Sequence, residues 1–201
     1  MKLILSDALL DFFATHQLLE LEDLVPPRFL VSTAPPLASW EESRHFLRMH
    51  ADLESWVLHS ALGQIASFLY KRRPIRLAYT ALITQMPPPF TTSKTLQEIS
   101  CIDPILGGVF LSLANTSSQA STPLPDLHHI PSRHGIFVSA HHLIPFPSLC
   151  ASIQTTLLVV FTHAKPRYKL ELQDPCTHEL KKSGYAFGDQ ILEQDAPYLY
   201  H

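Results

Sequence analysis

The chain has 201 residues, a formal net charge of −3 at pH 7, 46% hydrophobic residues and 16% charged residues. This composition excludes an intrinsically disordered protein, because disorder goes with low hydrophobicity and high net charge. It also excludes a strongly basic surface of the histone type. The length allows one sizeable core, and the sequence predicts a single α+β domain over residues 1–201.

The amino-terminal part, residues 1–73, is predicted to be helical. A helix over about residues 6–24 has a broad apolar face, which is typical of a helix packed against a core. A second helical region, one helix or two, is expected over about residues 39–72. It begins at Ser39, which can form a capping box with Glu42 three residues later.

The hydrophobic period changes after Pro74, and residues 74–173 are predicted to be rich in strands. Apolar and polar residues alternate there with the two-residue period of strands that have one better-buried face. Helices followed by strands favour an α+β architecture over alternating βαβ units. We therefore expect the helices to pack on a mostly antiparallel sheet of about five strands, at about 75–85, 109–113, 135–144, 153–163 and 167–173.

Two segments are predicted to lie outside the sheet. Residues 115–134 form a loop rich in Ser, Thr, Pro, Asn, His and Asp, and a connection of that length is usually functional or disordered. The tail, residues 174–201, carries several aromatic side chains. These can pack on the core or on a partner.

Histidine is the most unusual feature of the composition. The chain has 12 histidines, and most of them follow residue 127. Imidazole and thiolate are ligands that zinc prefers. Adjacent histidines on a strand would point to opposite faces and could not share an ion. The sequence therefore predicts no cofactor, with zinc as the alternative, bound by His129, His134, Cys176 and His178.

The three cysteines predict a reducing compartment. They are odd in number, lie far apart and form no Cys-x-x-Cys pair, which argues against a disulfide framework. The amino-terminal apolar run ends at Asp7 and is too short for a signal peptide. The apolar stretch at 144–161 is interrupted by prolines and polar residues, so we expect no transmembrane segment. The predicted location is cytoplasmic or nuclear.

One basic cluster follows the predicted helices. Four positive charges within six residues could contact the phosphates of a nucleic acid or another anionic surface. The same charges would also be favourable at the carboxyl end of a helix, where the helix dipole is negative. The predicted nucleic-acid or anion-binding residues are Lys71, Arg72, Arg73 and Arg76.

Two other segments are candidates for protein recognition. The run from Pro87 through Pro88 and Pro89 to Phe90 could adopt the polyproline II conformation that aromatic-lined grooves bind. It could equally be a rigid connector. In the tail, Tyr198 and Tyr200 are candidate anchors for a partner.

The functional prediction follows from the motifs that the sequence lacks. No nucleophile elbow, phosphate loop or His-Glu-x-x-His helix is present. We therefore expect a non-enzymatic interaction protein, scaffold or oligomeric assembly subunit with a protein partner or self-association. Few glycines (6) and many prolines (17) favour a small viral accessory or structural protein. The alternatives are a zinc protein or metal-assisted hydrolase, and a nucleic-acid or anionic-surface binder that uses residues 71–76.

Overall fold

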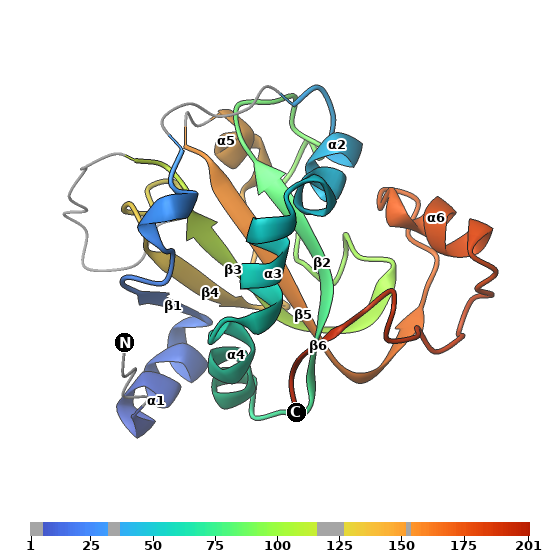
Figure 1. Ribbon diagram of the computed structural model, residues 1–201, viewed down its shortest axis with the longest axis horizontal. Coiled ribbons are helices and arrows are strands. Elements are labelled where there is room, and N and C mark those ends of the chain that lie inside the picture. The colour runs from blue at the N-terminus through green and yellow to red at the C-terminus, as the bar shows by residue number, and fades with distance from the viewer. Residues whose placement is uncertain (1–5, 32–36, 116–126, 152–153) are drawn as a thin grey trace.

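A curled antiparallel sheet forms the centre of the computed structural model (Figure 1). The structure describes residues 6–31, 37–115, 127–151 and 154–201. Within these residues the sheet has six strands in the order β1-β4-β3-β5-β2-β6, all paired in antiparallel fashion. The α+β prediction is confirmed, with one strand more than expected. The strands are β1 (Leu18–Leu21), β2 (Ile75–Ile83), β3 (Ile102–Ser112), β4 (Gly135–Ser139), β5 (Thr156–Tyr168) and β6 (Tyr198–Tyr200).

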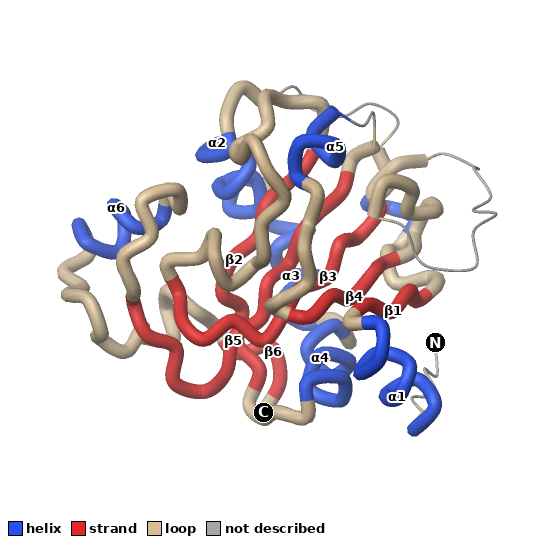
Figure 2. The backbone as a smooth tube through the Cα atoms, turned by 180° about the vertical axis from the view of Figure 1, so that it is seen from behind, coloured by secondary structure: helices blue, strands red, loops and turns tan. Residues whose placement is uncertain are grey.

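Helices cover one face of the sheet, and loops with a short helix cover the other, as Figure 2 shows from behind. We call these the helix face and the loop face. No helix among the described residues is long and apolar enough to cross a membrane. The helices are α1 (Asp7–His16), α2 (Trp40–His45), α3 (Ala51–His59), α4 (Leu62–Tyr70), α5 (Phe146–Ala151) and α6 (Cys176–Lys182), with 3-10 turns η1 (Pro27–Phe29) and η2 (Phe46–Met49).

The core has two layers because the sheet is buried on both faces. Neighbouring strand residues point in opposite directions, so Phe110 packs on the loop face and Leu111 on the helix face. All nine residues of β2 are buried. Strands covered on both faces are nearly continuous apolar runs, which is why β2 alternates only weakly in sequence.

The predicted helix over 6–24 is wrong in its second half. α1 ends at His16, because Gln17 adopts the left-handed conformation (φ 60°) and its N–H donates to the Phe13 carbonyl. The residues that follow form β1 and pair with β4. A leucine-rich run fits both the helical period and the strand period, and here the pairing with β4 makes it a strand.

The predicted helical region over 39–72 is confirmed in its position and corrected in its continuity. Ser39 caps α2 as expected, since its Oγ accepts from the Glu42 N–H at 3.2 Å and the Glu42 carboxylate accepts from the Ala38 N–H at 2.7 Å. The region is then divided into α2, η2, α3 and α4. The break before α4 comes at Ser60, whose backbone is extended (ψ 175°).

Two predicted strand boundaries are corrected by β5. The expected strand at 153–163 continues through Pro166 as β5, which ends at Tyr168. The expected strand at 167–173 is therefore wrong beyond Tyr168, and the expected strand at 109–113 is only the end of the long β3. Pro166 is tolerated because the β3–β5 register shifts there, between the pairs Ile105–Thr162 and Asp103–Arg167. Of the predicted loop at 115–134, residues 116–126 lie outside the described part of the chain.

Gly107 provides a test of how closely β3 and β4 pack. A β-carbon at this position would collide with the Val138 carbonyl oxygen and with the Tyr70 ring. We expect Gly107→Ala to lower the free energy of unfolding by more than about 2 kcal/mol, because the backbone carbonyl cannot move without breaking the ladder. Urea denaturation measures this, and a variant as stable as the wild type would contradict the packing.

Candidate functional site

A buried ion pair joins α2 to the segment that precedes α6. Arg44 Nη2 lies 3.0 Å from Asp174 Oδ1, and both side chains are fully shielded from solvent. The carboxylate also accepts the backbone N–H groups of Cys101 at 2.8 Å and Cys176 at 3.0 Å. One aspartate therefore connects α2, the start of β3 and α6.

Several donors around this pair have no acceptor within the described part of the chain. Among the described residues, Nε and Nη1 of Arg44, the Tyr79 hydroxyl and the Trp40 indole nitrogen are buried without a hydrogen-bond partner. The guanidinium lies 3.5 Å from the centroid of the Tyr79 ring and 5.9 Å from that of Trp40. An unpaired buried donor costs about 1–3 kcal/mol, so such a cluster suits an acceptor from outside the chain. We call Trp40, Arg44, Tyr79 and Asp174 the Arg44 centre.

A cavity of about 590 Å³ opens beside the Arg44 centre. Arg44 and Tyr79 form part of its wall, together with residues of β2, β3, η2, α3, α6 and the tail. α2 and α6 both lie on the β2 side of the sheet (Figure 1). The charged side chains around the cavity are of both signs: Arg44, Arg48 and Lys182 against Glu54, Glu179 and Asp195.

Burial sets the protonation states at the Arg44 centre. It raises the pKa of Tyr79 far above the usual range, so the hydroxyl remains a neutral donor. Burial alone would lower the pKa of Arg44, but Cys176 and Asp174 raise it by more, and the guanidinium stays charged. Burial also raises the pKa values of Cys101 and Cys176, so both thiols are protonated at neutral pH. The centre thus offers one cation and neutral donors.

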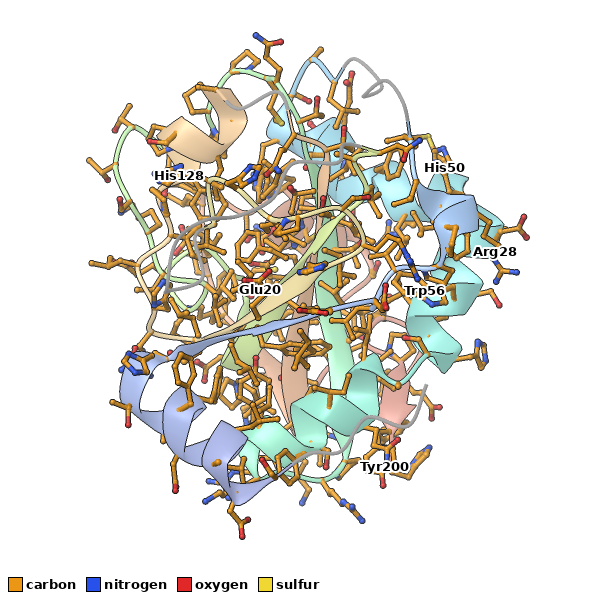
Figure 3. All side chains as sticks on the ribbon, turned by 90° about the vertical axis from the view of Figure 1, so that its left-hand side faces the viewer. Glu20, Arg28, His50, Trp56, His128 and Tyr200 are labelled. Atoms are coloured by element: carbon orange, nitrogen blue, oxygen red, sulfur yellow. The ribbon has the colours of Figure 1, made fainter. Side chains whose placement is uncertain are left out.

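The predicted zinc ligands lie at opposite edges of the sheet. His134 Nδ1 is 2.7 Å from Glu20 Oε1 beside β1, and Figure 3 labels Glu20 there. Cys176 and His178 belong to α6, beyond the other edge (Figure 1). Within the described residues no group of three His, Cys, Asp or Glu side chains could hold a metal ion. The structure therefore does not bring His134 together with Cys176 and His178, and His129 is half-buried in the segment before β4.

The members of the predicted basic cluster differ in burial: one is buried and three are exposed. Arg76 is 2% exposed, and it donates from Nε to the Ala196 carbonyl at 2.6 Å and from Nη1 to the Ala164 carbonyl at 3.3 Å. Its side chain therefore holds the tail rather than facing solvent. The exposed members are Lys71, Arg72 and Arg73, which follow α4.

The predicted partner-binding aromatic residues contact the chain itself. Tyr198 and Tyr200 belong to β6, which pairs with the first residues of β2. Phe90 is 3% exposed and its ring centroid lies 5.1 Å from that of Phe146. Of the proline run before it, Pro87 and Pro88 are exposed and Pro89 is half-buried.

Arg44, Tyr79 and Asp174 were not predicted as functional residues. The ion pair joins residues 130 positions apart, so no local spacing reports it. One signal was available. Trp40 and Arg44 are four residues apart, so they lie on the same face of the predicted helix. A positively charged side chain on that apolar face was therefore visible in the sequence.

Comparisons with known proteins identify the fold but no sequence family. No family model and no curated protein sequence matches the chain. Among solved structures, the non-heme α-ketoglutarate-dependent carbocyclase SnoK from nogalamycin biosynthesis matches with a TM-score of 0.64 and 15% identity over 96% of both chains. The α-ketoglutarate-dependent epimerase SnoN from the same biosynthesis matches with a TM-score of 0.65 and 10% identity, over 97% of this chain and 98% of SnoN. The complex of SnoN with Fe³⁺, α-ketoglutarate and nogalamycin RO matches with a TM-score of 0.63 and 9% identity.

These matches overturn the functional prediction. The expected non-enzymatic scaffold or assembly subunit is wrong, because the solved proteins with this fold are enzymes. The prediction of a viral accessory or structural protein is wrong for the same reason, because SnoK and SnoN are enzymes of nogalamycin biosynthesis. The prediction of no cofactor is also contradicted, because SnoN is solved with Fe³⁺ and α-ketoglutarate.

The two cofactors named for SnoN differ in how they fit this chain. Non-heme iron in α-ketoglutarate-dependent oxygenases is typically held by two histidines and one carboxylate on one face. The described residues contain no such set of three, and the Glu20–His134 pair has no third member. They therefore do not fit iron. The unpaired donors of the Arg44 centre do fit a carboxylate, which α-ketoglutarate carries.

The Arg44–Asp174 pair makes a prediction about stability. Arg44→Met should lower the free energy of unfolding by about 3–5 kcal/mol, because it leaves a buried carboxylate without its counter-ion. Asp174→Asn should cost about as much, since it leaves the buried guanidinium without its counter-ion and keeps only one of the two carboxylate acceptors. Urea denaturation of the single and double variants measures the coupling, which should be at least about 1 kcal/mol. Strictly additive losses would contradict a direct interaction.

The buried thiols make a prediction about reactivity. Burial raises the pKa of Cys150 to about 11, and it also raises the pKa values of Cys101 and Cys176. A higher pKa leaves less thiolate near neutral pH, so alkylation by iodoacetamide should be at least about tenfold slower in the folded than in the unfolded protein. Mass spectrometry over time measures this. Rapid labelling of any cysteine in the folded protein would contradict the burial.

Proposed function

We propose that this chain is an enzyme that acts on a small molecule, and that it binds a carboxylate of its substrate or cosubstrate at the Arg44 centre. The proposal rests on the unpaired donors of Arg44 and Tyr79, two residues that line the cavity. It is supported by the fold shared with SnoK and SnoN over nearly the whole chain. The SnoN complex contains α-ketoglutarate, a dicarboxylate.

The chemistry of the Arg44 centre suits a carboxylate. A carboxylate has two oxygens with about four acceptor sites, enough to accept from both the guanidinium and the Tyr79 hydroxyl. Hydrogen bonds to a charged donor are short and strong, and shielding from water strengthens them further. Asp174 holds Arg44 in place through Nη2 and leaves Nε and Nη1 to the ligand.

The size of the cavity agrees with a small ligand. Its volume of about 590 Å³ lies in the usual range for small-molecule sites. The described residues do not offer the ligand set for iron. We therefore assign to the Arg44 centre the binding and orientation of the ligand, and we assign it no oxidation step.

A titration with α-ketoglutarate tests the proposal. Isothermal calorimetry should detect binding to the wild type, and Tyr79→Phe should weaken it by about five- to tenfold through loss of one hydrogen bond. The same variant should be no less stable than the wild type without ligand, because no described residue gives the hydroxyl a partner. Arg44→Lys should weaken binding by at least about tenfold, since the ammonium cannot reproduce the planar guanidinium donors.

Arg48→Gln is the matched control for this titration. Arg48 lines the same cavity, but its side chain is 65% exposed and pairs loosely with Glu179 at 3.5 Å. Its loss should change the affinity less than about twofold, because exposed pairs contribute little. Failure of α-ketoglutarate, succinate and pyruvate all to bind would overturn the proposal. Equal affinity in the wild type, Tyr79→Phe and Arg44→Lys would do so as well.

Other predictions from the sequence are not tested by these observations. We propose that Lys71, Arg72 and Arg73 form an exposed anion-binding segment, without the buried Arg76. Self-association or a protein partner, a cytoplasmic or nuclear location, and a single domain over residues 1–201 stay predictions.

A further inference from the structure

A second cavity lies on the helix face, away from the Arg44 centre. It has a volume of about 1080 Å³ and runs between η1 and α3, and we call it the aromatic groove. Figure 3 shows Arg28, His50 and Trp56 close together on this side of the molecule. Phe46 of η2 lines the aromatic groove, whereas the next residues, Leu47 and Arg48, line the cavity of the Arg44 centre. The turn η2 therefore separates the two cavities.

Phenylalanine, tryptophan and histidine rings form part of the lining of the aromatic groove. The centroids of Phe29 and Trp56 lie 5.4 Å apart, with ring planes tilted by 41°. Phe46 and His50 are stacked with centroids 4.0 Å apart. Phe29 and Trp56 are only half-buried, so part of each ring remains available. Such a surface favours a flat, π-bonded ligand, because aromatic rings prefer offset-stacked and edge-to-face contacts.

Arg28 gives the aromatic groove a positive charge. Its guanidinium carbon lies 4.8 Å from the centroid of the Phe29 ring, and it is the one Lys or Arg of the lining. The single acidic residue of the lining is Asp52. Among the described residues Arg28 forms no ion pair with it or with any other carboxylate. An acidic group on the ligand would supply the missing counter-ion.

Two histidines add acceptors. Nδ1 of His50 lies 2.9 Å from the Phe46 carbonyl oxygen, and Nδ1 of His59 lies 2.8 Å from the Ser55 carbonyl oxygen. A carbonyl can only accept, so each Nδ1 carries the proton. In the neutral rings, each Nε2 is then left as an acceptor. A hydroxyl on the ligand could donate to either ring.

We propose that the aromatic groove is a binding site for a planar aromatic acid. The ring packs on Phe29 and Trp56, and the acidic group pairs with Arg28. This site is distinct from the Arg44 centre and does not depend on the function proposed there. It gives the chain a second ligand of a different chemical class, on the other side of η2.

Calorimetric titration with 2-naphthoate tests this site. Trp56→Leu should weaken binding by at least about tenfold through loss of ring contact. Arg28→Gln should weaken it by about fivefold, as expected for a partly exposed charge contact. Uncharged 2-naphthamide should bind the wild type about as weakly as 2-naphthoate binds Arg28→Gln. Cyclohexanecarboxylate, which has the acid but no aromatic ring, should bind more weakly than 2-naphthoate.

Two control variants make the result specific. Trp56→Phe keeps a ring and should retain affinity within about threefold, which separates ring contact from a fold defect. Arg48→Gln removes an exposed charge on the other side of η2 and should leave 2-naphthoate binding unchanged. The proposal is overturned if the wild type binds no 2-naphthoate at millimolar concentration, or if Trp56→Leu binds it equally well. Loss of binding in Arg44→Lys but not in Arg28→Gln would place the ligand in the other cavity and would also overturn it.

Discussion

The architecture around the candidate site depends on the carboxylate of Asp174. It accepts from Arg44 and from the backbone of Cys101 and Cys176, so α2, the start of β3 and α6 meet at one buried group. A buried charge of this kind is costly unless each acceptor site is used, and here the aspartate is fully satisfied. Arg44 is not, because two of its nitrogens have no partner among the described residues. This asymmetry between the partners is the reason for proposing a binding centre here rather than a purely structural ion pair.

The two faces of the sheet explain where polar chemistry can occur in this chain. Both faces are filled by apolar side chains, including Phe110 on the loop face and Leu111 on the helix face. Polar groups gather instead at the edges, where Glu20 meets His134 beside β1 and the Arg44 centre lies beside β2. The fold is similar to that of SnoK and SnoN, and the described residues offer donors for a carboxylate but lack the ligand set for iron.

The sequence predicted features that depend on neighbouring residues. The capping box at Ser39 and the strand that became β2 are local patterns, and both were located within about two residues. Leu18–Leu21 was assigned to a helix because only its pairing with β4 makes it a strand. The Arg44–Asp174 pair spans 130 positions, and no spacing in the sequence connects its members. The candidate site was missed for this reason.

Nuclear magnetic resonance of the arginine side chains tests the central claim most directly, because it observes the unpaired Nε–H of Arg44 itself. The signal can be assigned by its loss in Arg44→Lys. The account predicts that this signal shifts and saturates when α-ketoglutarate is added, while the signal of the exposed Arg48 changes little. A stationary Arg44 signal, with ligand-dependent shifts confined to exposed arginines, would contradict a carboxylate site at the Arg44 centre.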